Sequence, residues 1–569
     1  MMQIPDPIHG YIELDGMFAH IVNTPEFQRL RSVEQGSFRP VYPGARHDRF
    51  AHSLGTYHLA TGFVEHFFEN LRKDAGIRVD PAERERLSLT FRYAALLHDI
   101  GHAPFSHTTE GFFAERKGSN GLIAIWNDLC NAVDQVDPAE GKLFLNRKEK
   151  CGAPHEIMSA TVLVEQWQHF HEKNKEGTYV PVVDLALAAR MVIGLPYSPA
   201  DAAELKGQDA AGLGVRNCLI QMLNYSVLDV DRLDYMLRDA RMSGFVNAPL
   251  DLACLARSVT AVKGEDGMLT NAYREEALRV FDLMFQAKLS HDAWVLAAPA
   301  GAYDAALLAH CIRRLNERIQ DADPDKTYMN TIFTAKALSR EGVEFAGKRY
   351  RLLSDVDVSA DLKAQDGEPF DELYTRAISK RRIAAWRSYY EYHHLFNCPD
   401  EGITPEKAYG FFRELLKYMN QQNLFVFDAD AYERILGNKT DEKGNPIPRA
   451  EENVVRAAKL LRDFLYQIHG AKKPNPKFNV VLLDRTNSFT LKLDPTKIFI
   501  VFPRLENGNK RLPLRSGKYN YSTYAQLTGN RFPVKAEEPY FYIMSHDRLG
   551  CRQLEKLRAM LAKELKRQQ

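Results

Sequence analysis

A largely apolar helix that ends on two ionisable residues is the strongest constraint in this sequence. Residues 88–100, SLTFRYAALLHDI, are apolar on nearly every side, which predicts a helix buried on most of its faces. The helix ends on the pair His98 and Asp99. Adjacent side chains point about 100° apart on a helix, so both can reach one cation only if it lies beyond the helix end. Imidazole and carboxylate both bind divalent metals, so this helix end is a candidate metal site.

Two ligands do not complete a metal site, and the sequence offers two more at a distance. His52 lies in HDRFAHSLGTYHLA (47–60), beside a helical stretch, and Asp231 lies in the amphipathic segment LDVDRLDYMLRD (228–239). An aspartate among apolar neighbours is costly to bury without a positive charge, which a metal would supply. Two imidazoles with two carboxylates suit Fe, Mn, Ni, Zn or Mg better than they suit a structural zinc site. The predicted ligands are His52, His98, Asp99 and Asp231.

The first 330 residues are predicted to be mainly α-helical. Apolar residues recur at helical spacing in several further segments, and a stretch rich in Gly, Asn, Asp and Lys resembles a loop inserted between two helices. The predicted helices are 155–174, 224–242 and 274–296, and the predicted insertion is about 117–153.

Two further regions follow this core. We expect a helical extension over 331–477 and a smaller mixed β/α region over 478–569, because β-branched and aromatic residues become frequent there. Within the extension we expect a hairpin at 344–355, helices at 370–395, 405–418 and 452–468, and a connector at 437–450. Within the last region we expect strands at 478–485, 489–493, 497–502 and 538–545, and a basic helix at 548–569.

Charge and cysteine usage limit the classes of function. The chain has 75 basic and 74 acidic residues, which gives no global electrostatic support for binding nucleic acid or membranes. The basic C-terminal helix could still provide a local positive patch that binds nucleic acid. Seven scattered cysteines without a C-x-x-C pair predict reduced thiols and a cytoplasmic chain. The N-terminus does not resemble a signal peptide, and no apolar run reaches about 18 residues, so we expect no membrane span.

Several motifs in fixed order make the sequence similar to a known family. The order H…HD…D is the signature of the HD-domain metal phosphohydrolases. The wider pattern resembles the HD-domain deoxynucleoside triphosphate triphosphohydrolases (dNTPases) over roughly residues 4 to 330. Because the first motif begins at residue 6, we expect no preceding SAM domain of the kind that one family member carries. The motifs are DPIHGYIEL (6–14), TPEFQRLR (24–31), VYPGARHDRFAHSLG (41–55), LLHDIGHAPFSH (96–107), HE (155–156) and DVDRLDYMLRD (229–239).

The resemblance implies a role for each matched residue. His52, His98, Asp99 and Asp231 would hold the metal, and a group of histidines with a nearby carboxylate would form the phosphate site. Further residues would contact the substrate's phosphate, deoxyribose and base. The implied catalytic residues are His102, His107, Glu110 and His155, and the implied substrate-binding residues are Gln35, Arg49, Arg232, Tyr235 and Asp239. Glu110 stands where the family usually has aspartate, and Arg232 where lysine is common. The segment after Gln35 departs from the family's more glycine-rich version.

The implied reaction converts a dNTP and water into a deoxynucleoside and intact triphosphate. His107 would protonate the leaving 5′ oxygen, oriented by Glu110, and a Mg²⁺ would accompany the triphosphate tail. The family also implies a homo-oligomer, a dimer or tetramer, regulated by nucleotides at its interfaces. Here Asn23 and Pro5 differ from the family's guanine-reading pattern, so another nucleotide effector, or none, remains open.

Two other functions remain open from the sequence. One is an HD phosphohydrolase or phosphodiesterase that acts on another nucleotide, and the other is a nucleic-acid-binding regulatory protein with an inactive HD site. Each single residue also has a structural alternative. His102 and His107 could stabilise a turn, Tyr235 could belong to the core, and Arg49 could pair with a nearby carboxylate.

Overall fold

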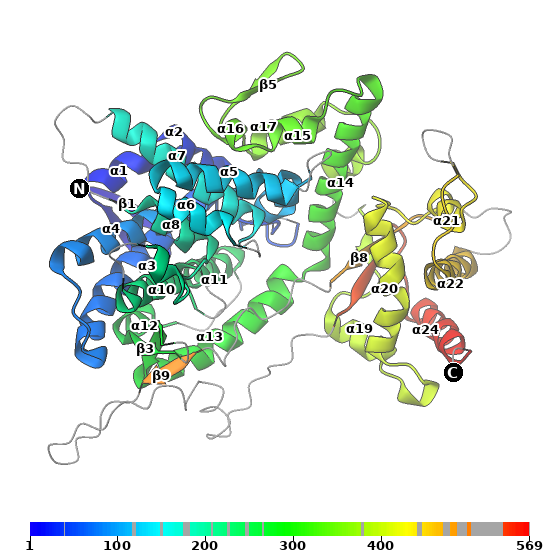
Figure 1. The fold of residues 1–569 in the computed structure, drawn as a ribbon. Helices are drawn as coiled ribbons and strands as arrows, with labels where there is room; N and C mark the ends of the chain where they lie inside the picture. The colour runs from blue at the N-terminus through cyan, green and yellow to red at the C-terminus, as the bar shows by residue number, and fades with distance from the viewer. Residues whose placement is uncertain are drawn as a thin grey trace.

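The fold is mainly α, with a helical HD-domain core and a smaller mixed α/β region, as predicted (Figure 1). It is seen in a computed structural model. The structure describes residues 1–38, 40–115, 121–147, 152–173, 183–205, 209–224, 228–244, 250–264, 267–376, 381–440, 446–469, 478–485, 498–501 and 539–567.

The core is built around the long helix α3 (Arg49–Asn70), which packs against α4 (Pro81–Leu97) and α11 (Val230–Ser243). Asp48 caps the start of α3 by accepting a hydrogen bond from the Ala51 N–H at 2.9 Å. Helix α4 is buried along its C-terminal half, as its apolar sequence predicts, and ends immediately before His98. The other helices of this part are α1 (Gly16–Val22), α2 (Pro25–Arg29), α7 (Pro154–Lys173), α8 (Leu185–Ile193), α9 (Asp201–Glu204), α10 (Ala210–Leu223) and α12 (Leu252–Ser258).

The predicted insertion at 117–153 is helical where the structure describes it, so the expectation of a loop was wrong there. It contains α5 (Gly121–Val136) and α6 (Pro138–Leu145). Ile125, Leu129 and Val133 recur every four residues and are fully buried. They form an apolar stripe along a helix, in a segment whose overall composition is polar. Helix α5 packs on α7 and α6, which makes this segment part of the core.

Short sheets surround the helices, and their strand pairing differs from the simple order along the chain. The sequence analysis missed the N-terminal hairpin of β1 (Met2–Asp6) and β2 (Gly10–Leu14), and the pair β3 (Val259–Lys263) and β4 (Leu269–Arg274). The predicted strand at 497–502 is β9 (Phe499–Val501), which runs parallel to β4. The strands expected over 478–569 therefore join two different sheets.

Two long helices lead from the core to the C-terminal elements (Figure 1). They are α13 (Leu278–His291), which continues as a π-helical turn at Asp292–Leu296, and α14 (Pro299–Ala322). The predicted helix at 274–296 thus begins later than expected, because strand β4 extends to Arg274. Short helices α15 (Tyr328–Ile332) and α16 (Ala335–Leu338) follow, then the predicted hairpin of β5 (Val343–Phe345) and β6 (Lys348–Tyr350), and α17 (Asp355–Lys363).

The C-terminal part is a small sheet covered by helices. Its strands are β7 (Ile383–Ala384), β10 (Phe541–Ser545) and β8 (Val480–Asp484), with β10 in the centre. Residues 370–395 were predicted to be helical, but α18 (Phe370–Tyr374) and α19 (Tyr389–Phe396) are separated by β7. The other helices are α20 (Pro405–Gln421), α21 (Ala429–Leu436), α22 (Glu452–His469) and α24 (Cys551–Lys566). The predicted strand at 489–493 lies outside the described residues.

Among the described helices, none is by itself long and apolar enough to cross a membrane. One bent pair, Glu275–Leu296 with Pro299–Ala322, meets the length and composition criteria together.

A buried ion pair joins α6 to α8. The Arg190 Nε donates to Glu140 Oε2 at 2.8 Å, and the Tyr197 hydroxyl donates to Glu140 Oε1 at 2.7 Å. The Arg190 side chain is fully buried and lies over the ring of Tyr197 at 4.1 Å. Removal of the carboxylate would leave this guanidinium charged without its partner in the core.

We predict that Glu140→Ala lowers the free energy of unfolding by about 3–5 kcal/mol, the usual effect of breaking a buried pair from one side. Urea denaturation of the full chain measures the change. Lys142→Ala, on an exposed position of the same helix, is the matched control and should leave stability close to that of the wild type. Equal stability of the two variants would contradict the prediction.

Candidate active site

The four predicted metal ligands lie together where α3, the end of α4 and the start of α11 meet. His52 Nε2 is 2.9 Å from Asp231 Oδ1 and 3.3 Å from His98 Nε2. Asp99 closes the group, with Oδ2 3.5 Å from His52 Nε2 and Oδ1 3.4 Å from His98 Nε2. Ligand atoms about 3 Å apart match the edges of a coordination shell whose metal bonds are about 2.0–2.2 Å long.

The hydrogen bonds behind the two histidines leave their inner nitrogens available to a cation. His98 Nδ1 donates to the Ala95 carbonyl at 2.9 Å, and His52 Nδ1 donates to Asp234 Oδ2 at 2.7 Å. Both rings therefore direct Nε2 towards the other ligands. This second layer of hydrogen bonds is typical of metal-bound histidines, because it fixes the tautomer and ring orientation.

The electrostatics of the group also suit a cation. Burial lowers the pKa of His52, but Asp231 and Asp234 outweigh burial and raise this pKa to about 10. Burial raises the pKa of Asp231, but its contacts with His52 and His98 hold it well below the ordinary range. The Asp231 side chain is 37% exposed, whereas His52 is fully buried, so the cluster is open on one side. The residues present fit the divalent metal that an HD domain implies.

Asp99 links this cluster to the adjacent residues. Its Oδ2 accepts a hydrogen bond from Arg49 Nη1 at 2.7 Å, and its Oδ1 lies 3.2 Å from His102 Nε2. Arg49 is buried and also donates to the Ser106 hydroxyl at 2.9 Å and the Gln35 carbonyl at 3.0 Å. Arg49, the predicted phosphate contact, thus forms an ion pair with Asp99. Its neighbour Asp48 instead caps α3.

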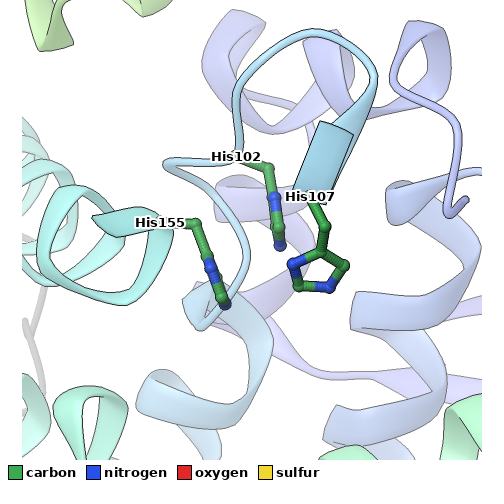
Figure 2. A group of neighbouring side chains, drawn as sticks. All are labelled: His102, His107 and His155. Atoms are coloured by element: carbon green, nitrogen blue, oxygen red, sulfur yellow. The ribbon is translucent and has the colours of Figure 1, made fainter. Parts of the chain in front are cut away.

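Three histidines form a second group beside the metal ligands (Figure 2). The His102 and His155 rings are stacked with centroids 4.2 Å apart and planes at 14°. His107 meets both rings edge-on, at 5.1 Å from His102 and 5.0 Å from His155. Glu110 connects the group through hydrogen bonds to His155 Nδ1 and, at 3.3 Å, to His107 Nδ1.

The geometry of this histidine group suits an anion better than a metal. An imidazole binds a metal in the plane of its ring, and the nearly parallel planes of His102 and His155 poorly direct two lone pairs at one ion. His102 is fully buried, with Nε2 3.2 Å from Asp99 Oδ1, and its Nδ1 lacks a hydrogen-bond partner among the described residues. Donors from these rings could instead meet the oxygens of a phosphate.

The three histidines differ in their preference for a proton. Burial, reinforced by Arg49, holds the pKa of His102 well below its ordinary value. Desolvation by the surrounding residues and the charge of Arg49 lower the pKa of His107, although Glu110 partly offsets this effect. Burial also acts on His155, but Glu110 outweighs it and raises the pKa of His155. The longer glutamate at position 110 therefore reaches His107, which it was expected to orient, and also His155.

The predicted sugar-binding residues lie on α11, which also carries Asp231. Tyr235 is partly exposed, with Lys288 Nζ 5.5 Å from its ring centroid. Asp239 is buried, and its Oδ1 lies 2.7 Å from His47 Nε2 while its Oδ2 lies 3.3 Å from His291 Nε2. Burial raises the pKa of Asp239, but these two histidines outweigh burial and lower it.

The other two substrate residues lie at the edges of the same region. Arg232 is buried, with Nη2 3.5 Å from Asp229 Oδ2. The backbone of Gln35 lies between Arg49 and His47, and its buried side-chain oxygen has no hydrogen-bond partner in the described part of the chain.

Sequence reasoning missed several residues that support the site. Four of them lie within the quoted motifs, where no role was assigned to them, and the other two lie on α13. Asp234 had a detectable signal, because it lies three residues after Asp231 and so on the same side of the predicted helix. His291 and Lys288 had none, since they approach from α13 only in the folded chain. The missed residues are His9, His47, Asp234, Arg238, Lys288 and His291.

Comparisons with known proteins agree with this geometry. Residues 49–133 match the HD domain family, a span that begins at α3 and includes His52, His98 and Asp99. The chain is 31% identical over 252 residues to deoxynucleoside triphosphate triphosphohydrolase SAMHD1 of Mus musculus, covering 42% of this chain and 32% of that protein. It is 45% identical over 209 residues to the Homo sapiens protein of the same name, covering 30% and 32%. It is also 45% identical over 196 residues to an uncharacterized protein of Methanocaldococcus jannaschii, covering 34% and 38%.

The matches are partial. The chain spans about a third of the length of the curated SAMHD1 relatives from mouse and human. The similarity thus concerns the HD domain and its surroundings, and supports the HD-domain dNTPase family to which the sequence motifs pointed.

Proposed function

We propose that this HD-domain chain, a relative of the deoxynucleoside triphosphate triphosphohydrolases, hydrolyses dNTPs to deoxynucleoside and triphosphate. The observation that carries the proposal is the junction at Asp99. One oxygen of this carboxylate is 3.4 Å from His98 Nε2 in the metal cluster and 3.2 Å from His102 Nε2 in the histidine group. A phosphorus atom between the two groups would contact both.

His52, His98, Asp99 and Asp231 would hold a divalent cation, which could be Fe, Mn, Ni, Zn or Mg. When bound, such a cation lowers the pKa of a water molecule and polarises a phosphoryl oxygen. A Mg²⁺ would accompany the substrate's triphosphate. The open side of Asp231 supports access of water and substrate to this position.

The histidine group would act on the phosphate and on the leaving oxygen. His102 and His155 would donate hydrogen bonds to phosphate oxygens, and Arg49 and Arg232 would add positive charge. His107 would give its proton to the departing 5′ oxygen, which is a poor leaving group without one. Its side chain is 59% exposed, and a bound polyphosphate would raise its lowered pKa by adding negative charge beside it.

Helix α11 would hold the sugar in a fixed relation to the reacting phosphate. Asp231, Tyr235 and Asp239 are spaced by four residues, so they follow one face of this helix. The Tyr235 ring would crowd the 2′ carbon, and Asp239 would accept a hydrogen bond from the 3′-hydroxyl. Gln35 would lie near the sugar and base, with its unpartnered oxygen available to a ligand.

Two further features belong to the proposal. We expect the chain to assemble as a dimer or tetramer and to work in the cytoplasm, with regulation by a nucleotide effector left open. These expectations come from the family resemblance and the cysteine pattern.

Product analysis tests the function directly. Purified protein incubated with each dNTP and Mn²⁺ or Mg²⁺ should release deoxynucleoside and triphosphate in equal amounts, as measured by chromatography. The variant His98→Ala/Asp99→Ala should lose both the activity and the metal detected by elemental analysis. Release of mono- or diphosphate, or activity on a cyclic nucleotide alone, would favour a different HD phosphohydrolase.

We predict that His107→Ala lowers kcat by about 10²–10⁴-fold, the usual contribution of a general acid. Metal content and nucleotide affinity should stay near the wild-type values, because His107 lies outside the metal cluster. Single-turnover kinetics with a dNTP measures the effect. A loss below tenfold would assign the proton to another donor.

We predict that Tyr235→Ala raises kcat/KM for rNTPs relative to dNTPs, because a gate that excludes by repulsion admits the larger sugar when it is shortened. Tyr235→Phe keeps the ring and is the matched control, so its sugar preference should not change. Parallel assays of each dNTP and rNTP pair provide the measurement. Equal use of both sugars by the wild type would refute the gate.

A further inference from the structure

The N-terminal hairpin reaches the back of the metal cluster. The turn between β1 and β2 places His9 beside α11, where His9 Nε2 lies 2.7 Å from Asp234 Oδ1. The carboxylate can only accept, so the imidazole donates. The His9 side chain is 4% exposed and Asp234 is fully buried, so water does not screen this contact. The hairpin therefore touches the residue that holds the ligand His52.

Asp234 is held from several directions at once. Its Oδ2 accepts from His52 Nδ1 at 2.7 Å and from Arg238 Nε at 2.8 Å. Its Oδ1 accepts from Arg238 Nη2 at 2.9 Å and from His9 Nε2 at 2.7 Å. His9 and His52 thus bind opposite oxygens of one carboxylate. A rotation of this carboxylate about its long axis would disturb the His52 ring as well as the hairpin.

The hairpin turn is itself fixed to the same helix. Asp6 Oδ1 accepts from the backbone N–H groups of Ile8 and His9, both at 2.9 Å, which closes the turn. Asp6 Oδ2 accepts from Arg238 Nη1 at 2.7 Å. The position of His9 is therefore defined by its own backbone and by the Arg238 guanidinium that also binds Asp234.

The packing around Asp234 leaves no space for a side chain at position 55 of α3. A Cβ atom at Gly55 of α3 would lie 1.8 Å from Asp234 Oδ1 and 2.5 Å from Arg238 Nη2. Helix α3 carries a glycine where the carboxylate presses against it, three residues after the ligand His52. The site thus brings the helix and the Asp234 carboxylate into direct contact.

We propose that His9 is a positioning residue of the metal centre, which acts through Asp234 to orient the ligand His52. Partners in the second layer around a metal usually change affinity by about 10–100-fold when removed. The inference rests on the metal part of the proposed function and is independent of the substrate. A hairpin histidine far from the metal ligands in sequence is thereby part of the site.

The test is the rate of metal release from the full chain loaded with Mn²⁺. An excess of chelator is added, and free and bound Mn²⁺ are followed by electron paramagnetic resonance. His9→Ala should release the metal about 10–100-fold faster than the wild type. His9→Gln, whose amide nitrogen occupies nearly the place of Nε2, should restore a rate close to that of the wild type. Asp234→Asn, which removes the charge at the centre of the network, should also accelerate release.

Tyr11→Ala is the matched control, because Tyr11 lies on the same hairpin and is 68% exposed. It should release Mn²⁺ at the wild-type rate. A second readout is the rise in Tm when Mn²⁺ is added to chelator-treated protein, since at a given concentration a ligand that binds more tightly stabilises the folded state more. This rise should be smaller for His9→Ala, whereas a hairpin residue with only a structural role would lower Tm equally with and without metal.

Each outcome decides the inference. Equal release rates for His9→Ala and the wild type would overturn it without touching the proposed reaction. If His9→Ala does not fold, His9→Asn replaces it, because its amide is too short to reach Asp234 while that of His9→Gln is not. Failure of the wild type to retain Mn²⁺ or any other divalent cation would overturn both the inference and the metal assignment. Retention of metal without dNTP hydrolysis would leave the role of His9 unaffected and would contradict only the proposed substrate.

Discussion

The buried carboxylates of α11 are the constraint on which the site depends. Asp234 and Asp239 are almost fully excluded from water, and such groups are tolerated in a protein interior only when opposite charges and donors surround them. Here the compensation comes from Arg238 on α11 itself and from histidines on distant segments: the hairpin turn, the start of α3, and α13. Each of these segments packs against α11 and supplies a partner for a buried carboxylate. The same electrostatic requirement therefore shapes both the core and the site.

The parts of the site that could be predicted are those whose residues follow one another closely in the chain. His98 and Asp99 were recognisable because they are adjacent at the end of an apolar helix, whereas the pair Tyr235 and Asp239 came from the family resemblance. The partners of these residues were not recognisable, since His47 and His291 meet Asp239 only after α3, α11 and α13 have packed together. No local pattern in a single sequence indicates such long-range contacts. Family resemblance supplied His155, whose own surroundings would have fitted an ordinary core histidine.

The fold shows the same division between local and distant information. Strong apolar periodicity predicted α4, α7 and α22 well. The segment 117–153 was misjudged because its polar residues obscured the stripe formed by Ile125, Leu129 and Val133. Strand β7 was missed because two residues within a helix-like composition pair with β10, which lies far along the chain. Sheet membership depends on partners, whereas helix formation depends mainly on neighbours.

The parallel pairing of β9 with β4 has a consequence for how the protein is made. Strand β4 is synthesised before the midpoint of the chain, but Phe499–Val501 emerges from the ribosome only near the end. Until then, the edge of β4 that later pairs with β9 presents unpaired N–H and C=O groups, which can recruit other extended chains. Contacts of such long sequence separation also slow folding. The sheet that contains β3 and β4 is therefore complete only after Phe499–Val501 has been made, and a chain truncated before this strand would expose an edge of β4 that β9 covers.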